Sequence, residues 1–381
     1  MQITLIAGAR PNFMKIAPIV HVIQKAEQQG DDIHYRLVHT GQHYDKNMSD
    51  TFFEELNIPA PDVNLGCGGG TQAEQTAHIM VAFEQELMMH KTDIVLVVGD
   101  VTSTMACSIV AKKLNTKVCH VEAGIRSWDL SMPEEINRMV TDSLADYLFT
   151  TSDIANANLR RIGVHNANEM TNDSPIRSCF WFVGNVMIDT LLANRKRFRK
   201  PAIYDNLNLS KKAYFVMTMH RPANVDEESH LKALMEQIIN NVHGLPIIFP
   251  IHPRTAKIFY KLWKDEEQLS KLFPNLHIVE PLGYLEFNYL VEQAKAVVTD
   301  SGGITEETTV LGVPCITLRD NTERPETCTI GTNELIGTDP AAIKPALDKL
   351  FAGNWKIGSV PPLWDGHTAE RIVSILMNIQ K

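Results

Sequence analysis

The sequence has few cysteines, and their spacing argues against a zinc site. Six cysteines occur among 381 residues, and none forms a CxxC pair or another spacing typical of zinc ligands. Several lie in apolar stretches, where cysteine behaves as a small hydrophobic residue. We therefore expect reduced, mostly buried thiols, which are typical of a cytoplasmic protein.

Long apolar runs are also missing. No run reaches the roughly 18 residues that a membrane-spanning helix needs, and the opening MQITLIAGARPNF shows neither a basic leader nor a cleavage site of small residues. We expect no membrane insertion. With 44% hydrophobic and 21% charged residues, the composition is that of an ordinary globular protein, and the length suggests about two domains.

Two phosphate-binding signatures are absent as well. No GxGxxG follows the first apolar run and no GxxxxGK[ST] occurs, which argues against a nicotinamide-dependent oxidoreductase and against a P-loop nucleotidase. The net charge of -9 argues against non-specific binding of nucleic acid. An anionic ligand would need local Arg or Lys side chains or helix N-termini.

What the sequence does contain is an alternation of short apolar runs and helical patterns. Predicted strands include ITLIAG, DIVLVVGD and TKVCHVEAG in the first half, and AYFVMTMH, KAVVTD and VPCITL in the second. This β-α alternation predicts parallel sheets covered on both faces. Because the alternation restarts after a turn-rich stretch near residues 185–205, we expect two doubly wound domains that face a cleft. The expected boundaries are 1–190 for the N-terminal domain, 191–365 for the C-terminal domain, and 366–381 for a helix that packs back on the N-terminal domain.

Charged or titratable side chains follow nearly every predicted strand, where parallel α/β sheets bind ligands. They are Arg10 and Lys15, then Gln42 and His43, Asp100, Glu122 with Arg126, the group Glu134, Glu135 and Arg138, and later His220, Arg221, His252, Arg254 and Ser301 to Gly303. Singly, each has a structural explanation: Asp100 can cap a helix, and Glu134 and Glu135 suit a first helical turn. Together, on one predicted cleft, they favour a functional site.

The stretch Thr299–Glu326 predicts a strand, a tight turn, a helix and another strand. Ser301–Gly303 fall at the start of that helix, where free N–H groups can hold phosphate and glycine permits close approach. An ordinary turn with a serine cap also explains this segment. Glu307 could accept hydrogen bonds from ribose, although acidic residues suit this position in any case. Arg324, after the next strand, could neutralise a diphosphate.

Six motifs, in chain order, give the sequence a family resemblance. GARPNFMK, VGDVTST, HVEAGIRSWDLSMPEEINR, TMHRPANVD, TDSGGITEE and RDNTERPE together resemble the non-hydrolysing UDP-N-acetylglucosamine 2-epimerases, over most of the chain. The resemblance implies a GT-B-like α/β fold of two Rossmann-type domains, a homodimer, and neither a metal nor a nicotinamide cofactor. It also implies interconversion of UDP-GlcNAc and UDP-ManNAc, which supplies ManNAc units for surface polysaccharides.

In that family, UDP is eliminated across C1–C2 to give 2-acetamidoglucal and is added back with C2 inverted. This chemistry needs acid/base groups for both faces of C2 and stabilisation of the leaving UDP. The motifs assign catalysis to Asp100, Glu122, Glu134 and His220, and substrate binding to Arg10, Lys15, Leu282, Phe287, Ser301, Gly302, Gly303, Glu307 and Arg324. Phe287 matches the aromatic residue beside the uracil, and Leu282 matches a nearby backbone contact.

The sequence departs from some relatives in three places. The loop GIRSWDLSMPEE is shorter than the SPWPEE form of those relatives. YDKNMSD, after Gln42 and His43, lacks a further glutamine that relatives with a regulatory second UDP-GlcNAc site have. The segment around 166–179 resembles an insertion, and the sequence assigns it no role.

Three other activities remain compatible with the sequence. A hydrolysing epimerase would release ManNAc and UDP with much the same residues, and a glycosyltransferase shares the fold. A nucleotide-sugar sensor would bind without turnover, but the presence of all three acids and His220 argues against it. The product formed from UDP-GlcNAc separates these activities.

Overall fold

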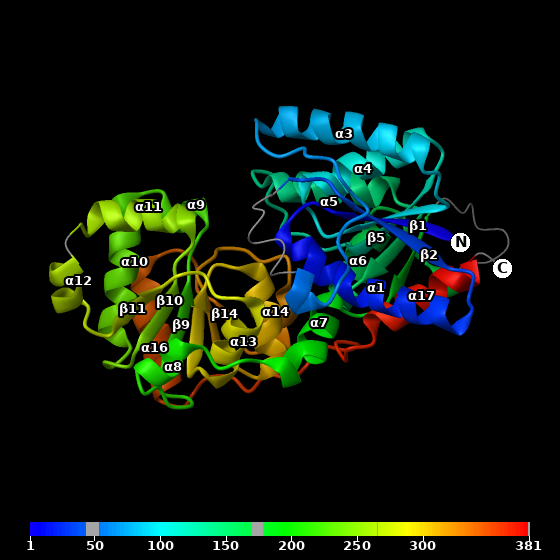
Figure 1. The fold of residues 1–381 in the computed structure, drawn as a ribbon. Coiled ribbons are helices and arrows are strands. Elements are labelled where there is room, and N and C mark those ends of the chain that lie inside the picture. The colour runs from blue at the N-terminus through cyan, green and yellow to red at the C-terminus, as the bar shows by residue number, and fades with distance from the viewer. Residues whose placement is uncertain (43–52, 170–177, 265, 380–381) are drawn as a thin grey trace. The chain divides into compact units, whose positions relative to one another are not determined.

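The computed structural model describes residues 1–42, 53–169, 178–264 and 266–379, which divide into two compact units (Figure 1). Unit 1 comprises Met1–Asn194 and Pro362–Lys381, and unit 2 comprises Arg195–Pro361. His43, the YDKNMSD stretch and residues 170–177 of the expected insertion lie outside the described residues. Within these, none of the helices is both long and apolar enough to cross a bilayer.

Unit 1 is built on an eight-stranded sheet in which every pairing is parallel. Its central strands are continuous apolar runs, as expected for strands buried on both faces. In spatial order the strands are β3 (Val63–Asn64), β2 (His34–His39), β1 (Gln2–Ala7), β4 (Ile94–Val98), β5 (Lys117–Ala123), β6 (Tyr147–Thr150), β8 (Cys179–Phe182) and β7 (His165–Asn166).

Two groups of helices pack in unit 1 (Figure 1). The helices α3 (Gln72–Met89), α4 (Thr102–Lys113) and α5 (Pro133–Leu144) pack side by side. The second group consists of α1 (Arg10–Gln29), α7 (Val186–Asn194) and α17 (Thr368–Ile379). Pro11 lies in the first turn of α1, where its missing N–H costs nothing. Unit 1 also contains α6 (Asp153–Arg161) and the short η1 (Ala167–Glu169).

The C-terminal tail belongs to unit 1. The Trp364 indole donates to the Thr151 carbonyl at 2.9 Å, and Arg371 donates to the Val183 carbonyl at 2.9 Å. The N–H of Ala369 donates to the Asp189 carboxylate at 2.7 Å. These bonds fasten the start of α17 onto α7 and onto the strand ends beside it.

Unit 2 is built on a six-stranded sheet, also wholly parallel. In spatial order its strands are β11 (Leu276–Val279), β10 (Ile247–Pro250), β9 (Phe215–Thr218), β12 (Ala296–Thr299), β13 (Cys315–Thr317) and β14 (Asn333–Leu335). Alternate residues serve opposite faces: Phe215 and Met217 enter one core cluster, whereas Val216 enters the other.

Helices cover both faces of this second sheet. The larger cluster includes side chains from α10 (Glu228–Asn241), α11 (Pro253–Leu262) and α16 (Ile343–Phe351), and the smaller one from α8 (Ala202–Asn206), α13 (Tyr284–Gln293) and α14 (Gly302–Leu311). The other helices are η2 (Arg195–Arg197), α9 (Pro222–Val225), α12 (Glu266–Leu272), α15 (Pro325–Thr329) and η3 (Pro340–Ala342). The expected α/β fold with two doubly wound sheets is confirmed.

Candidate active site

Each sheet has a topological switch point near its centre. Strand order reverses between β1 and β4 in unit 1, and between β9 and β12 in unit 2. Doubly wound sheets bind ligands in the crevice outside the carboxyl ends of such a strand pair. The polar residues that the sequence places after these four strands therefore lie at two well-defined points of the fold.

Glu122 occupies a β-bulge near the end of β5. The pairing of β5 with β6 shifts between Val121 and Ala123, so Glu122 is the extra residue, and its backbone has a φ of 72°. That conformation is rare for a residue with a side chain, and bulges often re-aim side chains beside functional sites. The Glu122 carboxylate forms an ion pair with the ammonium of Lys15 on α1, and both side chains are almost wholly buried.

Gly99 leaves room for this ion pair. It follows β4 with a φ of +66°, and a Cβ at this position would lie 2.8 Å from the Lys15 ammonium nitrogen. A side chain here would displace Lys15 and strain the backbone. The ends of β1, β4 and β5 thus meet around Lys15, Gly99 and Glu122.

The turn between β1 and α1 is fastened by Asn12. Its side-chain oxygen accepts from the N–H groups of Gly8 and Ala9 at 3.1 and 2.9 Å, and its amide donates to the Val98 carbonyl at 3.1 Å. These bonds tie the turn to the end of β4. Arg10, the first residue of α1, is exposed beside this anchored turn.

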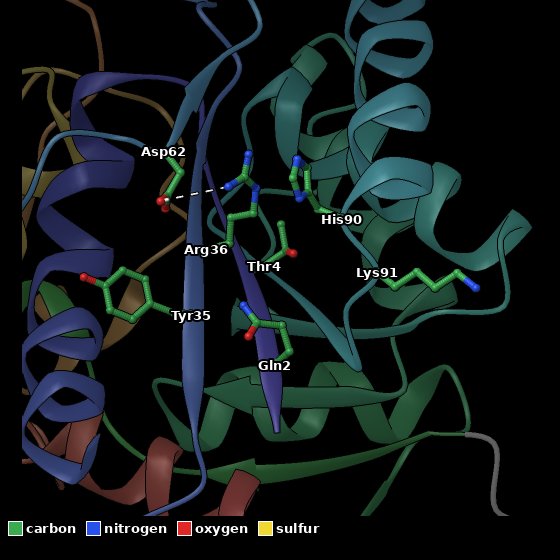
Figure 2. Close-up of a pocket in the computed structure, with 7 residues that line it drawn as sticks. All are labelled: Gln2, Thr4, Tyr35, Arg36, Asp62, His90 and Lys91. Atoms are coloured by element: carbon green, nitrogen blue, oxygen red, sulfur yellow. Dashed lines mark ion pairs between the residues drawn. The ribbon is translucent and has the colours of Figure 1, made fainter. Parts of the chain in front are cut away.

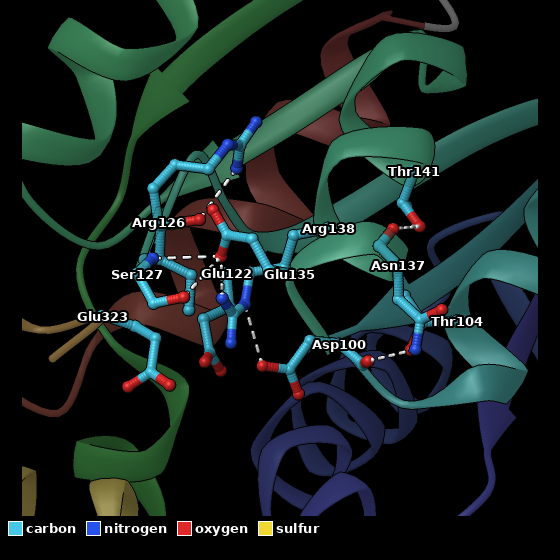
Figure 3. A network of polar contacts seen from close by, with 12 residues as sticks. Asp100, Thr104, Glu122, Arg126, Ser127, Glu135, Asn137, Arg138, Thr141 and Glu323 are labelled. Atoms are coloured by element: carbon cyan, nitrogen blue, oxygen red, sulfur yellow. Dashed lines mark hydrogen bonds and ion pairs between the residues drawn. The ribbon is translucent and has the colours of Figure 1, made fainter. Parts of the chain in front are cut away.

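Asp100, directly after Gly99, is held from α5 (Figure 3). Arg138 Nε donates to the Asp100 carboxylate at 3.0 Å, and the Asn137 amide donates to the Asp100 backbone carbonyl at 2.9 Å. Arg138 is buried, whereas the Asp100 side chain stays partly accessible. Val101, not Asp100, is the N-cap residue of α4. Helix capping therefore does not explain why an aspartate occupies position 100. Residues of α5 orient its carboxylate, which stays accessible to a ligand.

Glu134 and Glu135 are adjacent in the first turn of α5 but have opposite environments. Glu135 is fully buried, pairs with Arg138, and accepts from the backbone N–H groups of Ser127 and Trp128 at 3.0 and 3.1 Å. It thus fixes the loop before the helix (Figure 3). Glu134 is exposed. Of the two carboxylates, Glu134 is the one that a ligand can reach.

His220 and Asp300 meet at the switch point of unit 2. His220 Nδ1 lies 2.9 Å from the Asp300 carboxylate, which also accepts from the backbone N–H groups of His220 and Arg221 at 3.0 and 2.9 Å. Burial by itself raises the pKa of Asp300, but the hydrogen bond and charge of His220, with the backbone donors, outweigh it and lower that pKa. The ionised Asp300 makes Nδ1 of His220 the donor, so Nε2 is the nitrogen available to a ligand.

His252 lies beside His220, with ring centroids 5.7 Å apart. Its Nδ1 accepts from the Arg254 N–H at 3.2 Å and so caps α11. Burial, and then the charge of His220, lowers the pKa of His252. In this structure His252 acts as the N-cap of α11 and lies beside His220.

Ser301, Gly302 and Gly303 form the start of α14, as the sequence predicts. Ser301 is the N-cap residue, yet within the described part of the chain its side chain makes no capping hydrogen bond. The three residues are partly exposed, and the first N–H groups of a helix have no partner inside it. This helix end suits an anion, and the serine-cap explanation of the segment is not supported.

Three arginines lie at the same helix end. Arg319 binds the buried Glu323 carboxylate through two hydrogen bonds of 2.9 Å. Nitrogen atoms of Arg221 and Arg324 each lie 3.8 Å from that carboxylate. Arg324 also lies close to the turn, because a Cβ on Gly302 would stand 3.3 Å from its Nη1. Guanidinium groups and helix N–H groups therefore converge at the start of α14, as a phosphate site requires.

Leu282 and Phe287 are partly buried against the same core cluster as Ile304 and Leu311 of α14. Glu307, in α14, is almost fully buried, and its carboxylate lies 3.5 Å from the Asn288 amide nitrogen. Burial, and then the charge and hydrogen bond of Glu307, raises the pKa of Tyr284 on α13. Glu307 is thereby tied to α13, the helix that includes Phe287.

A hollow of about 490 Å³ in unit 1 lies elsewhere (Figure 2). Its lining consists of Gln2, Thr4, Tyr35, Arg36, Asp62, His90 and Lys91. Gln2 and Tyr35 stand near the starts of β1 and β2, whereas the candidate residues follow strand ends. Arg36 is engaged by Glu86 at 2.6 Å and Asp62 at 4.0 Å. We therefore place the candidate site at the switch points and not at this hollow.

The sequence did not single out Asp300 or Asp142. A signal for Asp300 was present, because it is the last residue of the predicted strand KAVVTD and precedes the Ser-Gly-Gly turn. Asp142, in the last turn of α5, gave no such signal, since an acid on a helix is typical of its solvent-facing surface. Only the tertiary structure shows that this carboxylate is fully buried.

Comparisons with known proteins agree on one family. A family model described as UDP-N-acetylglucosamine 2-epimerase matches residues 25–377. A UDP-N-acetylglucosamine 2-epimerase of Methanocaldococcus jannaschii is 41% identical over 386 residues, covering 99% of each chain. The crystal structure of the M. jannaschii UDP-GlcNAc 2-epimerase with UDP-GlcNAc and UDP has a TM-score of 0.85 at 40% identity, covering 99% of this chain and 100% of that one. A UDP-2,3-diacetamido-2,3-dideoxy-D-glucuronate 2-epimerase of Pseudomonas aeruginosa is 36% identical over 340 residues, 88% of each chain.

Proposed function

Because the chain belongs to the UDP-N-acetylglucosamine 2-epimerase family, we propose that it interconverts UDP-GlcNAc and UDP-ManNAc without net hydrolysis. A base takes the C2 hydrogen as a proton while the C1–O electron pair leaves with UDP, which gives 2-acetamidoglucal. UDP then adds back to C1, and a proton returns to the other face of C2. No electron is gained or lost overall, so the residues need only move protons and bind UDP.

The observation that supports this proposal most directly is the arrangement of carboxylates in unit 1. Glu122 is aimed by a bulge and paired with Lys15, and Asp100 is oriented by Arg138. Glu134 is exposed on the same helix as Arg138. We assign proton transfer at C2 to Asp100, Glu122 and Glu134, because inversion needs acid/base groups for both faces.

Binding of the nucleotide is assigned mainly to unit 2. The start of α14, Ser301 to Gly303, and the Arg324 guanidinium offer donors to a diphosphate. Phe287 and Leu282 offer an apolar border for the uracil, and Glu307 a carboxylate for the ribose. Lys15 and Arg10 provide positive charge in unit 1, and His220, polarised by Asp300, serves as an acid/base group.

The test is turnover of UDP-GlcNAc in D2O, followed by NMR of the products. The proposal expects UDP-ManNAc with deuterium at C2, because carboxylates exchange their protons with solvent. It also expects oxygen label in the C1–O–P bridge to scramble over the β-phosphate, because that bond breaks during turnover. Retention of the original hydrogen at C2 contradicts proton transfer and the roles given to the three acids.

Two other products would replace the proposal with an alternative. Free ManNAc and UDP would identify a hydrolysing epimerase. An absence of turnover until a sugar acceptor is added would identify a glycosyltransferase. Asp100→Asn serves as the inactive control in each assay, so that a contaminating activity is recognised.

A second candidate substrate follows from the P. aeruginosa relative, which is named for UDP-2,3-diacetamido-2,3-dideoxy-D-glucuronate. This sugar has a carboxylate and a second acetamido group, and epimerisation at C2 would use the same acids. Measuring kcat/KM for both nucleotide sugars with one enzyme preparation decides between them. A higher value for the diacetamido sugar would reassign the substrate and leave the mechanism in place.

We also propose that the chain is a cytoplasmic homodimer that supplies ManNAc units for surface polysaccharides. Support for the location comes from the cysteines, all six of which are thiols, five of them buried. Support for the dimer comes from exposed apolar side chains on α3 and α5, namely Val81, Met88, Met89, Ile136 and Met139. Sedimentation equilibrium tests the dimer, and replacement of Met88 and Ile136 by lysine should produce monomers.

A further inference from the structure

Three titratable residues, His120, Arg126 and Asp142, form a buried cluster in unit 1. His120, on β5, lies with Nδ1 2.7 Å from one oxygen of Asp142 on α5. The other Asp142 oxygen lies 2.6 Å from the Arg126 guanidinium and accepts from the Gly124 N–H at 3.1 Å. His120 Nε2 lies 2.8 Å from the carbonyl oxygen of Gly99. The side chains of His120 and Asp142 are wholly buried.

The partners of His120 decide its protonation. A backbone carbonyl oxygen can only accept, so Nε2 must hold a proton to bond Gly99. Asp142 already accepts from Arg126 and Gly124. The Arg126 guanidinium, 2.6 Å away, and the Gly124 N–H hold Asp142 as an ionised carboxylate without help from His120. An ionised carboxylate can only accept too, so Nδ1 also holds a proton. Turning the ring by 180° would place carbon atoms against both acceptors.

We propose that His120 is a buried imidazolium at neutral pH and that it acts as the positioning residue for Asp100 and Glu122. It does not touch the reacting sugar in this proposal. It fixes the backbone on either side of the two carboxylates to which the proposed function assigns proton transfer.

The connections that transmit this positioning are short. Gly99, immediately before Asp100, is fixed twice to β5: its carbonyl accepts from His120, and its N–H donates to the Val121 carbonyl at 3.1 Å. Gly124, two residues after Glu122, is also fixed twice: its N–H donates to Asp142, and its carbonyl accepts from the Asn158 amide at 3.0 Å. The bulge at Glu122 lies between these anchors. A single imidazolium–carboxylate pair therefore sets both the turn before Asp100 and the bulge.

Among the described residues, no charged group on the neighbouring elements takes the place of Asp142 as the partner of His120. The other titratable groups on the helices and strands packed against β5 are Cys107, Lys112 and Lys113 of α4, Glu134, Glu135 and Arg138 of α5, and Tyr147 of β6. Burial raises the pKa values of Cys107 and Tyr147, so both are neutral at neutral pH. Lys112 pairs with Asp146 at 2.8 Å, and Arg138 pairs with Glu135. Glu134 and Lys113 are exposed. Asp142 is therefore the anion in contact with His120.

Nitrogen-15 NMR of the full chain with labelled histidine tests the protonation directly, and His120→Gln assigns the signals. We expect both ring nitrogens of His120 to be protonated at neutral pH, because each faces an acceptor. In Asp142→Asn the anion is lost, so His120 should become the neutral tautomer with its proton on Nε2, still bonded to Gly99. A neutral His120 in the wild-type protein at neutral pH overturns the proposal, whatever the activity of the chain.

Kinetics test the positioning, and this part rests on the proposed function. His120→Gln keeps a donor but not the charge, and we expect kcat to fall about 10²-fold, as for a displaced catalytic group. The affinity for UDP should stay unchanged, because nucleotide binding is assigned to other residues. His165→Gln, an exposed histidine of the same unit, is the matched control. Wild-type kcat in a folded His120→Gln protein overturns the positioning role.

The two parts separate failure of this inference from failure of the proposed function. A wild-type chain that does not turn over UDP-GlcNAc contradicts the proposed function, while the NMR result still judges His120. If His120→Gln melts far below the wild type, Asp142→Asn takes its place in the kinetic assay, with the same expected loss of kcat at unchanged affinity for UDP. Wild-type kcat in Asp142→Asn then overturns the positioning role.

Discussion

The switch points of the two units have the same strand topology but opposite arrangements of charge. In unit 1, cations hold carboxylates: Lys15 pairs with Glu122, and the buried Arg138 orients Asp100. In unit 2, carboxylates hold basic side chains: the buried Asp300 orients His220. Glu323 does the same for the arginines at the start of α14.

The difference follows from which partner is more buried. An ion pair inside a protein must satisfy its buried member with several hydrogen bonds, and the more accessible member then faces the ligand. Arg138 is 1% exposed and Asp100 20%, whereas Asp300 is 0% exposed and His220 41%. The accessible member is thus the acid Asp100 in unit 1 and the base His220 in unit 2, whereas Lys15 and Glu122 are both almost wholly buried. The two units share a fold, but the buried member of the pair is a cation, Arg138, in unit 1 and an anion, Asp300, in unit 2.

The largest expected effect comes from neutralising the carboxylates of unit 1 to which the proposed function assigns proton transfer. Asp100→Asn and Glu122→Gln should each lower kcat by about 10²–10⁴-fold, the usual contribution of a general acid or base. The affinity for UDP, measured by calorimetry, should change little. Glu84→Gln, an exposed acid on α3, is the control. A loss of UDP affinity equal to the loss of kcat would show that unit 1 binds the nucleotide as well.

Glu134 and Glu135, adjacent in α5, allow an exposed acid to be compared with a buried one. Glu135→Gln leaves Arg138 buried without its anion, so the free energy of unfolding should fall by about 3–5 kcal/mol. Glu134→Gln, at the exposed neighbour, should change that free energy by less than about 0.5 kcal/mol but still lower kcat. Chemical denaturation gives the free energy of unfolding of each variant, and steady-state kinetics gives its kcat. If Glu134→Gln leaves kcat unaltered, the proposed catalytic role of Glu134 is wrong.

For unit 2 the corresponding change is loss of a presented cation. Arg324→Ala should weaken UDP binding by about 2–3 kcal/mol, as for other charged hydrogen bonds. Arg324→Lys should recover only part of this, because an ammonium cannot form a bidentate pair. Arg195→Ala, which removes an exposed arginine of the same unit, is the control. Since Arg324 also pairs with Glu306 at 2.6 Å, melting curves should accompany the titrations. Wild-type affinity in a folded Arg324→Ala protein would exclude the diphosphate contact.

The smallest expected effect concerns acid stability, where the buried anions of both units act alike. The pKa values of Asp142 and Asp300 are lowered in the folded chain by their histidine partners, against the opposing effect of burial. Their contribution is thus complete above the unfolded pKa of about 3.9 and is lost as the pH falls through the folded pKa, at about 1.4 kcal/mol per pKa unit.

Asp142→Asn and Asp300→Asn should each flatten the acid limb of the unfolding free energy plotted against pH. The exposed Asp31→Asn is the control. Equal acid limbs in all four proteins would mean that neither buried anion contributes to pH-dependent stability.

Much of the fold could be predicted from the chain alone. Buried parallel strands such as IVLVV are continuous apolar runs, and helices such as α1 have a 3.6-residue period with proline in the first turn, so their types can be recognised locally. The family could also be recognised, because each of its motifs is a short continuous stretch.

What the sequence could not give is which charges pair and which member is buried. His220 and Asp300 are 80 residues apart, and Lys15 meets Glu122 only because β1, β4 and β5 are neighbours in the sheet. Glu134 and Glu135 look alike in sequence, yet one is exposed and the other is fully buried. Strand order and helix packing decide these contacts. Burial then determines whether a charged group is exposed to a ligand or holds its neighbour in place, since the cost of an unpaired charge depends on the surrounding medium and not on the residue type.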